Sequence, residues 1–350
     1  MHRKNFLRLS GFSLASLIFK SSVANALDHS DHLSLPDEVY VQSSSEWLKL
    51  EKLSRGKYGF KDFKVLLKEI NDCIEVHVNS PKDALRAIRL NWKHSGYEKS
   101  RCLGDHWERT YGDVSFNAFE FNKKFPWYFI QSDGAATNCF GVKTGCNSIC
   151  HWNVDANHMQ LTLDTRSGGI GVQLGKRTLH AATIISLKNN FGENCFTTGQ
   201  RFCKMMCYNP RLPKQPVYGI NDWYFAYGNN SSSLILEHTK MLSDLALNNS
   251  NRPFSVIDAG WAAYSPLLPG DCCWQDDFSK PNEKFGDMKK VAEDIIKLGM
   301  RPGLWTRPLS ASYKDKPSLL LPKIPGRTEP KNPILDPTIE SNLERIHHNI

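Results

Sequence analysis

The chain has 350 residues, of which 40% are hydrophobic and 23% charged, and its formal net charge is +8. This composition is typical of a soluble globular protein, it excludes a disordered or membrane-embedded chain, and the length allows two domains of ordinary size. The positive charge is not gathered into Lys/Arg blocks or interleaved with aromatic residues. A nucleic-acid partner is therefore not expected, because such binding needs a clustered basic surface.

The first 26 residues have the pattern of a secretory signal peptide. Arg3 and Lys4 precede an apolar run over residues 12–19, and Ala24 and Ala26 supply the small residues of a cleavage site. Residues 3–7 also resemble a relaxed twin-arginine signal, with Lys4 in place of the second arginine. The run is too short for a membrane span and no later stretch is long enough. We expect export to the periplasm or the medium; the alternative is a buried N-terminal helix.

The ten cysteines fit an oxidising compartment. Their spacing does not resemble a zinc site, because Cys203 and Cys207 stand alone and Cys272 and Cys273 are adjacent. Disulfides and buried thiols both stay open. There is also no Gly-rich phosphate loop after a strand and no clustered His/Cys/Asp set, so neither a metal nor a cofactor is expected.

Residues 36–212 favour an antiparallel β-sandwich. Short runs rich in β-forming residues are separated by turn clusters, and several alternate apolar and polar side chains. Helical periodicity is scarce here, which favours packed sheets. The clearest predicted strands are 75–78, 127–130, 158–164 and 168–174.

A proline cluster marks the end of this region. Pro210, Pro213 and Pro216 fall within the segment 209–216, which can continue neither a helix nor a central strand. We therefore predict a domain boundary here, with a second domain over residues 217–350.

The second domain alternates predicted strands and helices. The three strands are expected over 217–225, 253–258 and 301–305, and the helices over 231–247, 285–298 and from Asp336 onwards. Gly299 stands where a C-terminal helix cap is common. This order is that of the first part of a (β/α)8 barrel, truncated after about three βα units.

Tryptophans and an aspartate follow the predicted strands, at the end of a barrel where active sites form. Trp223 follows the first strand, Asp258 and Trp261 the second, and Trp305 and Arg307 complete or follow the third. Indole rings pack on the C–H faces of sugars and carboxylates accept from their hydroxyls, so this set indicates a carbohydrate ligand. The alternative is that the tryptophans only pack the end of the domain.

Several motifs, in order, resemble those of α-galactosidase (melibiase)-type glycoside hydrolases. They cover nearly all of the expected mature chain. The motifs are the first-strand segment 218–228, the second-strand segment 257–261, the helix and third strand at 285–289 and 299–305, the helix start at 335–337, and the sandwich signature at 103–113.

The resemblance implies an exo-acting, retaining hydrolase of terminal α-galactosides or related α-glycosides. In this family one aspartate at the end of the fourth barrel strand attacks the sugar, and another after the sixth strand acts as acid and base. Neither strand is expected here, so both catalytic residues are expected beyond Ile350 and the chain alone is expected to be inactive. The family positions that carry over bind substrate.

Those positions are one carboxylate that binds sugar hydroxyls and several side chains that form the pocket around it. Asp258 corresponds to the first of two adjacent aspartates that hold galactose hydroxyls. The resemblance assigns the walls of the sugar pocket to Trp223, Trp261 and Trp305, and adds Arg307.

The second aspartate of the family pair is replaced by Ala259. The loss removes a charge-assisted hydrogen bond of about 1.5–3 kcal/mol, so the sugar preference stays open. Asp258 has an alternative role as a strand-end residue that caps a loop. The polar run Asp105, Glu108, Arg109 and Asp113 either borders the sugar site or forms an ion-paired turn within the sandwich, and we favour the turn.

Two functions of different class remain. The first is an exported α-galactosidase-type hydrolase, present as an N-terminal fragment. The second is a non-catalytic glycan-binding protein or a decayed gene product. Further βα units encoded after Ile350 would favour the first, and a stop codon there would favour the second. The sequence does not specify an oligomeric state.

Overall fold

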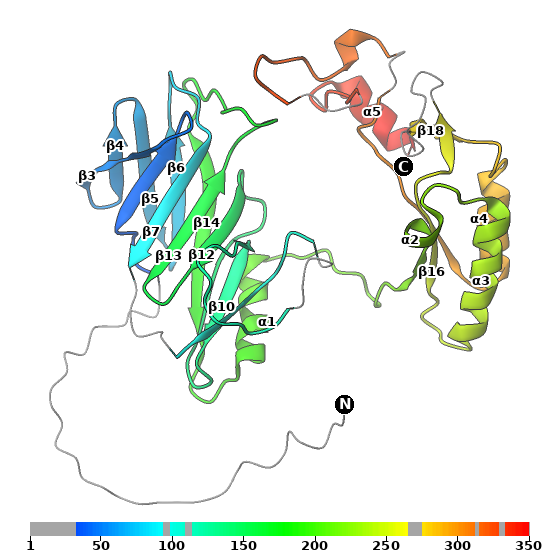
Figure 1. Cartoon of the computed structure of the whole chain (residues 1–350), viewed down its shortest axis with the longest axis horizontal. Helices are drawn as coiled ribbons and strands as arrows, with labels where there is room; N and C mark the ends of the chain where they lie inside the picture. Colours follow the sequence, from blue (N-terminus) through cyan, green and yellow to red (C-terminus); the bar gives the residue numbers. More distant parts are fainter. Residues whose placement is uncertain are drawn as a thin grey trace, which may run out of the picture.

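The computed structural model describes residues 33–93, 99–108, 114–264, 275–311, 315–328 and 333–349. The described chain is mostly β-sheet with few helices (Figure 1). Two large antiparallel sheets occupy its N-terminal part, and a parallel sheet with flanking helices lies in the C-terminal part. The predicted signal peptide lies outside the described residues.

The first large sheet has six strands in the order β2-β1-β7-β13-β12-β9. These strands are β1 (Glu38–Gln42), β2 (Trp47–Lys49), β7 (Ala87–Lys93), β9 (Phe125–Pro126), β12 (Ile149–Val154) and β13 (His158–Asp164). The second sheet has eight strands in the order β3-β4-β5-β6-β14-β11-β10-β8. They are β3 (Glu51–Ser54), β4 (Lys57–Phe60), β5 (Phe63–Ile70), β6 (Cys73–Asn79), β8 (Arg101–Gly104), β10 (Tyr128–Ser132), β11 (Thr137–Val142) and β14 (Leu179–Lys188).

The two sheets share one hydrophobic core, because alternate side chains of each strand point to the same face. Leu90 of the first sheet and Val76 of the second are both fully buried in this core. Trp152 of β12 and Phe129 of β10 meet there edge-to-face, with ring centroids 5.6 Å apart. This arrangement is consistent with the β-sandwich predicted from the sequence.

Helix α1 (Cys195–Met206) was not expected from the sequence. Asn194 caps its first turn by accepting a hydrogen bond from the backbone N–H of Thr197 at 2.9 Å. Phe202 is fully buried in a small core with Cys139 and Ile185 of the eight-stranded sheet. The neighbours of these two strand residues face the main core, so α1 covers part of the sheet's outer face.

Two predicted strands of this region need correction. The strand over 168–174 is wrong: Gly168 and Gly169 have φ values of 58° and 88°, and only isolated bridges such as Leu85 with Val172 form there. The strand predicted over 127–130 is observed as β10, which begins one residue later, at Tyr128. Trp127 has a φ of 67°, which no regular strand residue adopts.

All eight cysteines in the described ranges are thiols. Cys102, Cys139 and Cys150 are buried. Burial raises the pKa of Cys139 to about 12, which keeps it neutral and unreactive. Cys272 and Cys273 lie outside the described residues.

The C-terminal part contains a parallel sheet in the order β15-β16-β19. Its strands are β15 (Gly219–Asn221), β16 (Phe254–Ile257) and β19 (Arg301–Leu304), and a separate antiparallel pair is formed by β17 (Ala262–Tyr264) and β18 (Gln275–Pro281). The helices are α2 (Trp223–Ala226), α3 (Ser232–Ala246), α4 (Met288–Lys297), the 3-10 turn η2 (Pro317–Leu319) and α5 (Glu340–Asn349).

The two long predicted helices exist, with shifted ends. Ser231 caps α3 through its side chain, and Asp287 caps α4 by accepting from two backbone N–H groups. Ile235 of α3 and Ile295 of α4 are fully buried in a second hydrophobic core, on one face of the parallel sheet. Gly299 has a φ of 76° directly after the C-cap of α4, as expected of a terminating glycine.

Other expectations for this part were incomplete. The strand predicted over 217–225 spans only Gly219–Asn221, and α2 follows it. The loop expected after β16 contains the β17–β18 pair. The last helix begins at Glu340 rather than beside Asp336, whose carboxylate instead accepts from the N–H of Thr338 at 2.9 Å.

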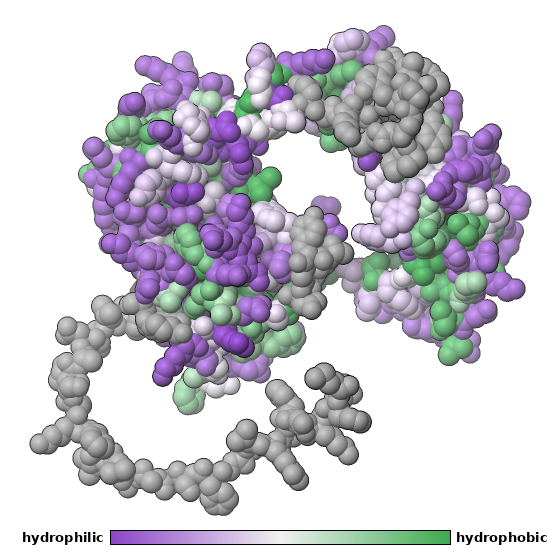
Figure 2. Space-filling view, in the orientation of Figure 1, coloured by the Kyte–Doolittle hydropathy of each residue, from purple (hydrophilic) through white to green (hydrophobic). Residues whose placement is uncertain are grey.

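Figure 2 shows apolar surface where Figure 1 draws α3. Met241, Leu245 and Leu247, on this helix and at its end, are 54%, 81% and 76% exposed. None of the helices in the described ranges has the length and apolar character to cross a bilayer.

The segment 208–217 is exposed throughout and belongs to no helix or strand. We expect trypsin to cleave the folded protein first after Arg211 and Lys214, because an exposed irregular segment is accessible to proteases. Mass spectrometry of the early fragments checks this. Early cleavage spread evenly over residues 36–208 would contradict an independent N-terminal domain.

Candidate functional site

The three parallel strands end at one edge of their sheet. Asn221 of β15 pairs with Val256, and Ile257 of β16 pairs with Leu304 of β19. Residues that directly follow these strands therefore gather at this edge, as in other parallel sheets whose ligands bind at the carboxyl ends of strands.

A cleft of about 370 Å³ opens at this edge. It has aromatic, amide, carboxylate and guanidinium groups in its wall. The lining residues are Asn221, Trp223, Tyr224, Asp258, Ala259, Trp305 and Arg307.

Asp258 provides the carboxylate of the cleft and is held by two local donors. Its Oδ2 accepts from Asn221 Nδ2 at 2.7 Å, and its Oδ1 accepts from the N–H of Ala259 at 2.7 Å. The side chain is only half-buried. A carboxylate has about four acceptor positions, so Asp258 keeps capacity to accept from a ligand.

Asp222 lies behind the cleft and is almost fully buried, with 1% exposure. Its Oδ1 accepts from the N–H of Asp258 at 2.8 Å, and its Oδ2 accepts from Asn230 Nδ2 at 3.0 Å. Burial raises the pKa of Asp222 above its usual value, whereas these two hydrogen bonds oppose the rise. Asn230 Nδ2 also lies 3.2 Å from the carbonyl of Asp258 and 3.1 Å from that of Ala259.

The aromatic residues predicted for the site divide into two groups. Trp223 and Trp305 line the cleft and are half-buried, and the guanidinium of Arg307 lies 5.3 Å from the Trp305 ring centroid. Trp261 is 3% exposed and does not line the cleft. Its indole N–H donates to the Trp305 carbonyl at 2.8 Å and its ring packs edge-to-face on Phe278.

The prediction that Trp261 forms a wall of the pocket therefore needs correction. The strand-end spacing that brought Trp223, Asp258, Trp305 and Arg307 together could not show that the Trp261 ring, directly before β17, packs into the second hydrophobic core. Its contact with the Trp305 carbonyl gives it an indirect role: it fixes the backbone beside the cleft.

The structure describes the polar run of the sandwich in part. Asp105 accepts from the N–H of His106 at 2.8 Å, while Arg109 and Asp113 lie outside the described residues.

Sequence reasoning did not single out three polar residues of this region: Asn221, Asp222 and Asn230. The first two stand inside the first-strand motif, next to Trp223, so their position at a strand end was an available signal. Asn230 had no such signal, because two of its three acceptors are the backbone carbonyls of Asp258 and Ala259, 28 and 29 residues further along the chain.

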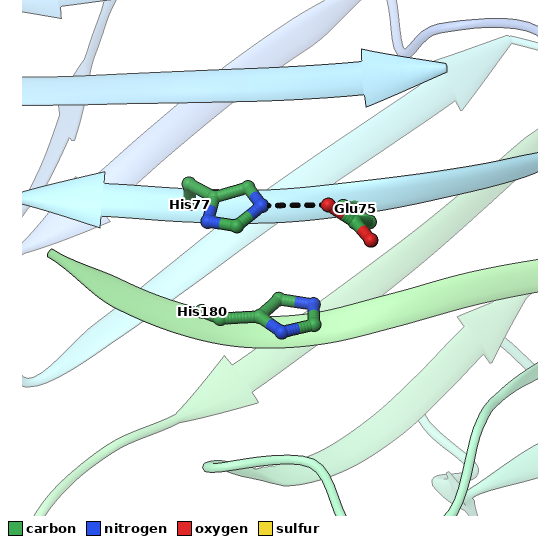
Figure 3. Close-up of side chains that lie close together, drawn as sticks. All are labelled: Glu75, His77 and His180. Atoms are coloured by element: carbon green, nitrogen blue, oxygen red, sulfur yellow. Dashed lines mark hydrogen bonds and ion pairs between the residues drawn. The ribbon is translucent and has the colours of Figure 1, made fainter. Parts of the chain in front are cut away.

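A second group of polar side chains was also not predicted from the sequence, because no clustered metal-binding set was found there. Glu75, His77 and His180 lie together on the eight-stranded sheet (Figure 3). His180 is remote from the other two in sequence, so only the pairing of β6 with β14 brings them together.

No protein-family model and no curated protein matches this sequence. Solved structures do match. An α-N-acetylgalactosaminidase from Bifidobacterium bifidum, solved with GalNAc, has a TM-score of 0.52 and 10% identity, over 89% of this chain and 62% of that one.

Two further similar structures are more distant by TM-score. A GH36 α-galactosidase from Geobacillus stearothermophilus, in complex with raffinose, has a TM-score of 0.45 and 14% identity, over 89% of this chain and 52% of that one. A GH31 sulfoquinovosidase from E. rectale has a TM-score of 0.48 and 11% identity, with the same coverage of 89% and 52%.

This chain has a glycoside hydrolase-like fold. The similarity to the Bifidobacterium enzyme carries that conclusion, and at 10% identity it concerns the fold alone. The chain spans between 52% and 62% of the length of these three structures.

Asn230→Ala should destabilise the C-terminal part by about 1–3 kcal/mol, because it leaves the buried Asp222 carboxylate and two backbone carbonyls without their donor. The free energy of unfolding in urea measures this. Asn229→Ala is the matched control, since Asn229 is exposed and its backbone N–H, which donates to the Ala226 carbonyl, is kept in the variant. Equal effects of the two substitutions would refute the structural role of Asn230.

Proposed function

We propose that this chain is part of an exported glycoside hydrolase of the α-galactosidase type, and that its cleft binds the terminal sugar of an α-glycoside. The observation that carries the proposal is the joint placement of Asp258, Asn221 and two tryptophans in one cleft, at the carboxyl ends of parallel strands. The glycoside hydrolase-like fold supports the same class of substrate.

The polar side of the cleft fits sugar hydroxyls. Asp258 is an acceptor with free capacity, and Asn221 orients it through the 2.7 Å hydrogen bond. A hydroxyl that donates to the carboxylate forms a charge-assisted hydrogen bond, which is stronger than a neutral one. Arg307 is positively charged, lines the cleft beside Trp305, and has N–H groups of the kind that donate to hydroxyl oxygens.

The aromatic side of the cleft fits the apolar face of a sugar ring. Trp223 and Trp305 are half-buried, so part of each ring stays accessible. We therefore assign the stacking role to these two, with Trp261 as the residue that supports Trp305 from behind.

Catalysis requires more than this cleft supplies. A retaining hydrolase uses two carboxyl groups about 5–5.5 Å apart. Asp258 is the only carboxylate among the lining residues in the described part of the chain, and the buried Asp222 is engaged with the backbone of Asp258. We propose that β15, β16 and β19 are the first strands of a (β/α)8 barrel and that the catalytic pair belongs to a longer protein.

A single carboxylate in the cleft also favours one alternative, a protein that binds glycans without cleaving them. Both proposals share the same sugar-binding residues and differ only in turnover. Export remains a proposal too, based on the basic and apolar pattern of the first 26 residues.

Asp258→Asn should weaken sugar binding about 10- to 150-fold, equivalent to the loss of one charged hydrogen bond of about 1.5–3 kcal/mol. NMR titration of the chain with methyl α-galactoside measures the affinity. Asp244→Asn, on the exposed side of α3, is the matched control and should leave it unchanged.

A second variant tests which sugar the cleft prefers. Ala259→Asp restores the adjacent carboxylate found in α-galactosidases and should strengthen galactoside binding. Unchanged affinity in Asp258→Asn would remove Asp258 from the binding site, and unchanged affinity in Ala259→Asp would indicate a pocket built for a different sugar.

The chain as given should hydrolyse no glycoside, because loss of a nucleophile or an acid/base group costs many powers of ten in rate. The assay uses purified protein with a chromogenic aryl α-galactoside and a panel of other aryl glycosides. Turnover that persists through stringent purification would place the catalytic carboxylates within these residues and overturn this part of the proposal.

A further inference from the structure

The outer face of the eight-stranded sheet carries two histidines and a glutamate side by side (Figure 3). β6 and β14 are antiparallel neighbours, and His180 lies directly opposite His77 in their register. Glu75 is two residues before His77 and thus on the same face, whereas Ile74, Val76 and Val78 between and beside them are buried in the sandwich core.

The three side chains are close enough to share one ion. His77 Nε2 lies 2.9 Å from a Glu75 carboxylate oxygen, and the ring centroids of His77 and His180 are 4.7 Å apart at an interplanar angle of 16°. One ligand-type atom from each residue lies within 4.8 Å of the others.

A β-bulge shapes this site. The register shifts between His180 and Ala182, so that Thr183 comes to lie opposite Glu75, on the same face as His180. The Thr183 hydroxyl lies 3.0 Å from His180 Nε2. A hydroxyl in this position can hold one ring nitrogen of the histidine and leave the other to bind a ligand.

Lys68 is a cation on the neighbouring strand, since it lies opposite Glu75 in the register of β5 with β6. Its side chain is exposed, so water and salt weaken its repulsion of an ion held by Glu75, His77 and His180.

We propose that Glu75, His77 and His180 form a zinc site on the outer face of the sandwich. Imidazole and carboxylate are ligands that Zn²⁺ accepts, and three protein ligands leave one position for water. Tetrahedral bonds of about 2.0–2.1 Å separate ligand atoms by about 3.3 Å, close to the spacing that His77 and Glu75 already have. The ligand atom of His180 lies within 4.8 Å of the other two, so metal binding would draw its ring toward them.

The ion would link two strands that are distant in sequence and adjacent in the sheet. It would replace the proton shared by His77 and Glu75 and stabilise the pairing of β6 with β14, at the centre of the eight-stranded sheet. The site shares no residue with the sugar cleft, so the zinc proposal and the sugar-binding proposal can be refuted independently.

The test is calorimetric titration of the full, metal-free chain with Zn²⁺, together with thermal melting. We expect binding that Glu75→Gln and His180→Ala each weaken at least tenfold, and a rise in melting temperature of about 5 °C that both variants lose. Glu75→Gln keeps the shape of the side chain and can still bond His77, so its effect reports on the ligand charge rather than on folding. Circular dichroism confirms that each variant is folded.

His158→Ala is the matched control. His158 also pairs with a carboxylate, that of Asp155, but lies on the other sheet. Its loss should leave zinc binding unchanged. Zinc binding and melting shifts that are equal in the parent chain, Glu75→Gln and His180→Ala would overturn the proposal and place the bound metal at other residues.

Discussion

The buried carboxylate of Asp222 is the constraint on which the cleft depends. A carboxylate that is 1% exposed is costly unless its oxygens are hydrogen-bonded, and here one accepts from the backbone of Asp258 and the other from Asn230. These bonds fix the end of β15 against the end of β16. Gly260 completes the arrangement: its φ is 116°, and a Cβ at this position would lie 2.2 Å from Asn230 Oδ1. The same Cβ would lie 2.7 Å from Gly228 Cα and 2.8 Å from its carbonyl oxygen, so the close backbone and the positive φ both require glycine here.

The parts of the fold that the sequence predicted are those set by local pattern. β6 alternates buried and partly exposed residues, and α3 and α4 carry caps and an apolar face at helical spacing. These features are decided within ten or fifteen residues, so a single sequence contains them. The end of β16 was predictable for the same reason, since this short, largely apolar run stops at the polar residue Asp258.

The parts that escaped prediction depend on partners distant in sequence. Leu343 fits an apolar helical face, yet it is 43% exposed, and Asn342 is buried because its side chain donates to the carbonyls of Leu319 and Asp336. Trp261 has the spacing of a cleft residue and lies in the core instead. His180 meets His77 only through strand pairing with a bulge. No local pattern specifies such contacts, because tertiary packing decides them.

Two aspartates at neighbouring strand ends have different environments, and this difference separates structure from recognition. Asp222 is enclosed and its hydrogen bonds are used within the protein, so it has little left to offer a ligand. Asp258 is half-buried and lines the cleft. Its carboxylate accepts hydrogen bonds from the backbone N–H of Ala259 and the side-chain amide of Asn221. A ligand hydroxyl would meet a carboxylate already held in place, so little conformational entropy is lost on binding. Ala259 is buried at 3% and leaves the adjoining wall apolar, which makes the shape of that wall, and not only its charge, a determinant of which sugar fits.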